Sequence, residues 1–70
     1  MNHSPEDRIL EETLSKQKEL IEFYKKAIKQ SADQECKDLF KSLAKSLDSD
    51  MTSVAEEIAK HRMERKLREQ

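Results

Sequence analysis

Two polar residues, Gln17 and Asp50, interrupt rows of mainly apolar residues that recur at alternating spacings of four and three. Such rows form the packed face of a helix in a coiled coil or helical bundle. A polar group placed there is costly unless another group binds it. An amide and a carboxylate in a helical core can ligate a hard cation, or can fix the helix register by hydrogen bonding. These two residues are therefore the first candidates for chemistry, and we favour the structural role.

Three further residues have types that suit chemistry. Glu57 and His61 lie four apart on one helical face, which suits a metal ion if a third ligand is present and otherwise gives a surface ion pair, the interpretation we favour. Cys36 lies near a predicted helix start, where the pKa of a thiol can fall. It also lies on an apolar row, where a lone cysteine is most often a small core residue. The sequence contains no glycine-rich phosphate loop and no sensibly spaced Ser-His-Asp arrangement.

The rows that carry these residues predict two amphipathic helices. The first is expected at about residues 5–30, with Ser4 as its cap and Pro5 in its first turn. The second is expected at about residues 34–66, opened either by Ser31 with Gln34 or by Asp33. Its weakest stretch is 47–53, where we still expect a continuous helix because the apolar positions keep their phase. The short connection makes the helices antiparallel neighbours, and both termini are expected to fray.

The apolar rows also define the expected core and dimer interface. The first row is Leu10, Leu14, Gln17, Ile21, Tyr24 and Ile28. The second row is Cys36, Phe40, Leu43, Leu47, Asp50 and Val54, with Ile58 close to its continuation. In an alternative phase, Asp50 reaches solvent and Met51 fills the core. The pattern favours helices that pack against other helices.

The composition limits what the chain can build. Its 70 residues are 34% hydrophobic and 41% charged, so it is one small domain that spans residues 1–70. One cysteine and two histidines exclude an internal disulfide and a structural zinc site. A chain this small usually needs a disulfide, a metal site or self-association to form a stable fold. We therefore expect an all-α, antiparallel two-helix hairpin that dimerises into a ferritin-like four-helix bundle.

Charge and hydropathy narrow the partners. The formal net charge is −1, which gives no global reason to bind nucleic acid. The basic stretch from Lys60 to Gln70 contains no aromatic residue for base stacking, so nucleic acid is not an expected partner. No apolar run is long enough for a membrane span, and the N-terminus lacks a signal-peptide pattern. We expect a cytoplasmic protein whose first partner is itself.

Two segments, Lys18–Ala27 and Asp33–Ala44, carry a resemblance to a known family. An aromatic pair, Phe23-Tyr24, lies late in the first helix, and the second begins with acids and leads to Leu39-Phe40-Lys41-Ser42-Leu43-Ala44. This arrangement resembles the rubrerythrin-type branch of the ferritin-like superfamily over about residues 10–58, half of its usual four-helix domain. The resemblance implies three di-iron ligand positions, which are occupied here by Gln17, Leu47 and Asp50. Leucine cannot bind iron, so the ligand set is degenerate.

These observations predict a non-catalytic structural or interaction module that binds no cofactor. One alternative is an iron- or manganese-binding protein with a site across the dimer, for which Gln17, Asp50 and Glu22 are the weak candidates. A second alternative is a regulatory hairpin that docks on another helical protein.

Overall fold

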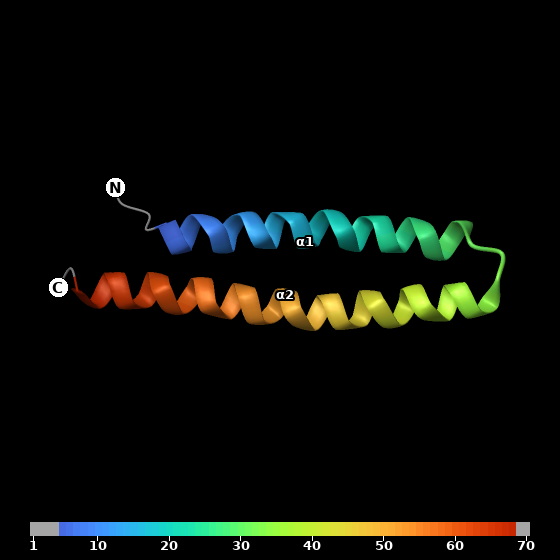
Figure 1. The fold of residues 1–70 in the computed structure, drawn as a ribbon. Helices are drawn as coiled ribbons and strands as arrows, with labels where there is room; N and C mark the ends of the chain where they lie inside the picture. The colour runs from blue at the N-terminus through green and yellow to red at the C-terminus, as the bar shows by residue number, and fades with distance from the viewer. Residues whose placement is uncertain (1–4, 69–70) are drawn as a thin grey trace.

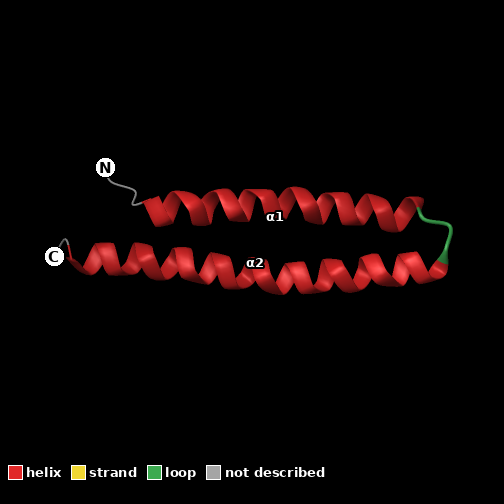
Figure 2. Cartoon of the chain, viewed as in Figure 1, coloured by secondary structure: helices red, strands yellow, loops and turns green. Residues whose placement is uncertain are grey.

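The chain forms two helices in a computed structural model that describes residues 5–68. Helix α1 covers Pro5–Gln30 and helix α2 covers Gln34–Arg68. They lie side by side and antiparallel, and one short loop joins them at one end (Figures 1 and 2). The resulting rod measures 56 × 17 × 13 Å. The predicted all-α hairpin is therefore present, while the proposed cap Ser4 and both predicted frayed ends lie outside the described residues.

The loop is fixed by caps, since the chain has no glycine. The amide of Ser31 still donates to Ala27 O at 2.9 Å, which continues α1 by one bond. Asp33 then opens α2: its Oδ2 accepts from the Cys36 amide at 3.2 Å, and its carbonyl accepts from the Lys37 amide at 3.0 Å. An N-cap carboxylate that binds the third amide of the helix satisfies one of its free donors. Of the two predicted openings, the structure uses Asp33.

Helix α2 is continuous through 47–53, the stretch of indifferent helix formers. Two of its hydroxyl groups donate back to carbonyls four residues earlier: Thr52 Oγ1 to Asp48 O at 3.2 Å and Ser53 Oγ to Ser49 O at 3.4 Å. Such bonds let Ser and Thr remain inside a helix without competing for its amides. The helix is therefore not interrupted there.

The face of α1 that packs on α2 follows the predicted row. Leu10, Leu14, Gln17, Ile21, Tyr24 and Ile28 are all half-buried. On α2 the matching row is Lys37, Phe40, Ala44, Leu47, Met51, Val54 and Ile58, all half-buried or buried; Glu57, His61 and Arg65 nearer the open end are half-buried as well. We call these two rows the seam. Around the loop end Tyr24 meets Phe40 across the seam, with ring centroids 6.1 Å apart.

At every second position, the seam of α2 contains the residue that follows the one in the predicted row. Cys36, Leu43 and Asp50 are exposed, and their neighbours Lys37, Ala44 and Met51 face α1 instead. Of the two phases that the sequence left open, the structure has the one in which Asp50 reaches solvent and Met51 fills the core. The expectation that Cys36 is a core residue is wrong.

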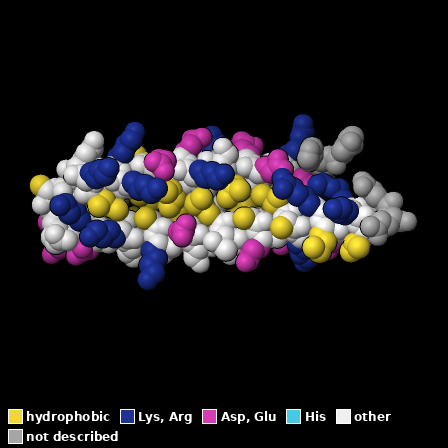
Figure 3. All heavy atoms as spheres, turned by 180° about the vertical axis from the view of Figure 1, so that it is seen from behind, with side chains coloured by type: hydrophobic (Ala, Val, Ile, Leu, Met, Phe, Trp, Pro, Cys, Tyr) yellow, Lys and Arg dark blue, Asp and Glu magenta, His cyan; other side chains and the backbone are white. Residues whose placement is uncertain are grey.

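The hairpin has very little core of its own. Among residues 5–68, Ile58 is the only hydrophobic residue classed as buried, with 7% of its surface exposed. The face shown in Figure 3 has a band of hydrophobic side chains along the line between the helices, flanked by lysine, arginine, aspartate and glutamate. The accessible surface is 5694 Å². A compact monomer of 8.3 kDa exposes only about 4,600 Å².

Candidate functional site

The most buried polar residue described is Asp7, in the first turn of α1, with 3% of its surface exposed. Its Oδ1 lies 3.0 Å from His61 Nδ1, and its Oδ2 accepts a hydrogen bond from Nη1 of Arg65. Both partners come from the last turns of α2. We call Asp7, His61 and Arg65 the open-end cluster, because they join the two helices at the end opposite the loop.

The helical repeat explains why these residues meet. Asp7 lies three residues before Leu10 on the seam of α1, and His61 and Arg65 extend the seam of α2 beyond Ile58 at the same four-three spacing. The antiparallel arrangement places the start of one helix beside the end of the other (Figure 1). The seam therefore changes from apolar to ionic in its last two turns.

His61 also contacts the carboxylate that the sequence assigned to it. Its Nε2 lies 3.0 Å from Glu57 Oε2, so each ring nitrogen faces a different carboxylate. Carboxylates only accept hydrogen bonds, so both contacts are satisfied only when both ring nitrogens carry hydrogen. Each ring nitrogen therefore has a carboxylate partner in this arrangement. Within residues 5–68, no group of three or more His, Cys, Asp and Glu side chains could hold a metal ion.

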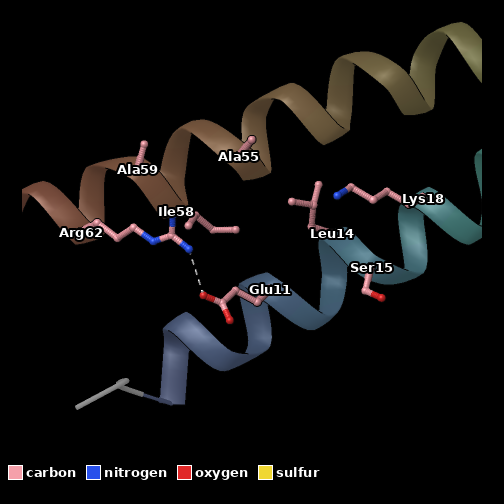
Figure 4. Close-up of a pocket in the computed structure, with 8 residues that line it drawn as sticks. All are labelled: Glu11, Leu14, Ser15, Lys18, Ala55, Ile58, Ala59 and Arg62. Atoms are coloured by element: carbon pink, nitrogen blue, oxygen red, sulfur yellow. Dashed lines mark hydrogen bonds and ion pairs between the residues drawn. The ribbon is translucent and has the colours of Figure 1, made fainter. Parts of the chain in front are cut away.

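A second cross-helix ion pair lies one turn further along α1. Arg62 Nη2 is 3.4 Å from Glu11 Oε2, and both side chains are largely exposed. The pair closes one end of a shallow groove, drawn in Figure 4, in which Leu14 and Ile58 point into the space between the helices. This groove is a gap along the seam with a charged rim.

The three weak metal candidates do not come together within the chain. Gln17 lies on the seam, where its Oε1 is buried and has no hydrogen-bond partner among the described residues. Asp50 is exposed on α2. Glu22 is exposed and pairs with Lys25, with 3.3 Å between Oε2 and Nζ. Only Gln17 thus occupies the core position at which the family resemblance places a ligand.

Cys36 has an environment that lowers its reactivity. The carboxylate of Asp33 accepts a hydrogen bond from the thiol and repels the thiolate charge, and these two effects raise the pKa of Cys36. A thiol is nucleophilic only as the thiolate. The predicted helix-start effect is therefore reversed by the capping residue itself.

Four exposed hydrophobic side chains lie in the loop half of the hairpin, while Ile9, Met63 and Leu67 are exposed toward the open end. Leu20 and Phe23 on α1 and Leu39 and Leu43 on α2 are all exposed hydrophobic residues. We call these four residues the loop-half patch. Phe23 also touches Tyr24, with ring centroids 6.2 Å apart. The patch therefore continues outward from the aromatic contact that closes the seam.

No protein-family model matches the chain, and neither a curated protein nor a solved structure matches it. In the part of the chain that the structure describes, neither helix is long and apolar enough to cross a membrane.

Proposed function

We propose that the protein is a self-associating helical module, in which two hairpins pack as an antiparallel four-helix bundle of the ferritin-like kind. The observation that carries this proposal is the missing core. One buried hydrophobic residue, Ile58, in the described chain is too little to offset the loss of chain entropy on folding. Pairing two hairpins is the simplest way to cover the remaining apolar surface, and twofold dimers are the commonest oligomers.

Two further observations support a structural role in place of an enzymatic one. The ring nitrogens of His61 contact Asp7 of α1 and Glu57 of α2, which supports a role in joining the two helices. The raised pKa of Cys36 favours the thiol over the nucleophilic thiolate. The resemblance of residues 10–58 to the rubrerythrin type supports the bundle and, through Leu47, a scaffold without the di-iron chemistry.

Sedimentation equilibrium tests this proposal. We expect a mass that rises with concentration toward twice the 8.3 kDa of the chain. Because only the folded dimer carries the extra contacts, the thermal midpoint should rise with protein concentration as well. A folded protein that stays at the mass of one chain up to about 200 μM, well above the dissociation constants of specific dimers, would overturn the proposal.

A further inference from the structure

We infer that two copies of the chain meet through the loop-half patch, so that the proposed four-helix bundle forms over the loop halves of the two hairpins. This inference rests on the proposed self-association and locates it. The argument uses the positions of the four residues, the charges around them and the area that they expose.

The four residues lie on one face of the hairpin. At the open end Glu6 and Ile9 of α1 line a shallow depression together with Glu57 of α2. Residues seven or fourteen apart occupy the same side of a helix that packs in a heptad repeat. Fourteen residues separate Glu6 from Leu20, Ile9 from Phe23, and Leu43 from Glu57. Leu39 lies four residues before Leu43, which places it beside Leu43.

Charge distinguishes this face in the loop half. In the loop half, the four helical rows that carry the patch contain Leu20, Phe23, Ala27, Gln30, Cys36, Leu39, Leu43 and Ser46, and none of these residues is charged. The matching rows on the opposite face contain Lys18, Glu22, Lys25, Lys29, Asp38, Lys41, Lys45 and Asp48, and all of these are charged. In a chain with 41% charged residues, this division marks one face for contact and the other for water.

Toward the open end the same rows change character. There the acids Glu6, Asp50, Glu57 and Glu64 outnumber the bases Lys16 and Lys60. Two copies pressed together along this part would bring like charges together, which costs free energy. The uncharged loop half meets its own copy without that cost. A second copy is therefore the occupant that fits the patch, and the contact is confined to that half.

The exposed area supplies most of what a dimer needs. The four side chains are between 39% and 59% exposed. With roughly 200 Å² for a free side chain of this size, they offer about 400 Å² on each copy. Two copies thus supply about 800 Å² of the ~1,000 Å² of a specific interface. Ala27 and Cys36, on the same rows, extend the contact.

The chain offers matched variants that test the location. Phe23 and Ile9 occupy the same row of α1 and are 59% and 62% exposed, and Leu39 and Leu67 share a row of α2 with 55% and 65% exposed. We expect Phe23→Ser and Leu39→Ser to raise the dimer dissociation constant by about 30-fold or more, because each dimer loses the side chain twice. Ile9→Ser and Leu67→Ser should leave it within about threefold.

Sedimentation equilibrium measures the dissociation constants, and far-ultraviolet circular dichroism checks that each variant is still helical. A wild-type dimer that is weakened equally by all four substitutions, or by none, would overturn the location and leave the self-association standing. A wild-type monomer at every concentration would overturn both.

Cys36 provides a test that needs no variant. It is exposed in the single chain and lies on the rows of the patch, seven residues before Leu43. Its alkylation by iodoacetamide should slow at least threefold when the protein concentration rises from well below to well above the dissociation constant. An unchanged rate on a protein that sedimentation shows to be dimeric would contradict the loop-half contact.

Discussion

The open-end cluster should contribute more to stability than any other polar contact between the two helices. The perturbation is Asp7→Asn, which keeps the size of the side chain and removes its charge. Asp7 is almost fully buried and contacts His61 and Arg65, whose side chains are 26% and 32% exposed. Hydrogen bonds to charged groups contribute about 1.5–3 kcal/mol each, and partial exposure places these two below that range.

The expected loss in the free energy of unfolding is therefore about 2 kcal/mol, or about 1 kcal/mol for each contact. For a domain of this size, that corresponds to a fall in the thermal midpoint of roughly 8–16 °C. The assay is urea unfolding followed by circular dichroism at one fixed protein concentration, because the proposed dimerisation would couple stability to concentration.

Two controls separate burial from other effects. Glu11→Gln removes the same kind of charge from an ion pair with Arg62 that is largely exposed, and it should cost less than about 0.5 kcal/mol. Glu6→Gln removes an exposed charge from the same first turn as Asp7, so it measures the interaction with the helix dipole alone. If all three substitutions cost the same, burial of the Asp7 carboxylate does not decide its contribution, and the reasoning is refuted.

Three further predictions concern α2 and the seam. Asp33→Asn keeps a capping side chain and removes the charge beside Cys36, so the pKa of the thiol should fall and its alkylation at neutral pH should become faster. A profile of alkylation rate against pH measures this change, and an unchanged profile would contradict the assigned cause. Gln17→Leu removes a buried oxygen without a described partner, so urea unfolding should show a gain of about 1 kcal/mol, and a loss would mean that the amide is bound. Met51→Ala should cost about 1–2 kcal/mol and Asp50→Ala less than about 0.5 kcal/mol, and the reverse order would contradict the observed seam.

The sequence predicts α1 more fully than α2, and the reason lies in the residues beside each row. In α1 the row one residue before the seam contains Ile9, Leu20 and Phe23 but also Thr13 and Lys16, so the row of Leu14 and Ile21 stands out. In α2 two phases share Phe40, Leu47 and Val54 and differ only at the positions between them. Hydropathy favours Leu43 over Ala44, and it chooses the wrong phase at that point.

Two later residues contain the information that corrects this choice. Met51 and Ile58 are apolar and lie seven apart, in phase with Ala44 and one residue after the row of Leu43. Lys37 occupies the first position of the row of Ala44, where its aliphatic stem can pack because lysine can bury its methylenes and keep its amine in water. The row that continues through Met51 and Ile58 therefore packs on α1, and the row that continues through Asp50 and Glu57 does not.

The open-end cluster shows why a candidate site can escape a sequence analysis. Glu57 and His61 are close in sequence, so their contact is predictable from spacing alone. The contact of His61 with Asp7 depends on the antiparallel register, which local spacing does not contain. Continuing both seams outward by one or two heptad positions, to Asp7 and to His61, would have revealed it.

The two ends of the hairpin hold the helices together in different ways. At the loop the chain itself holds the helices together, so side chains there need not all face inward. At the opposite end no covalent link holds them, and Asp7 joins the helices through His61 and Arg65 of α2. The apolar residues of the loop half can then project outward as the loop-half patch, since they are not required to close the hairpin. In the proposed dimer, the uncharged loop half would carry the contact between the copies, and the open-end cluster would hold together the two helices of each copy.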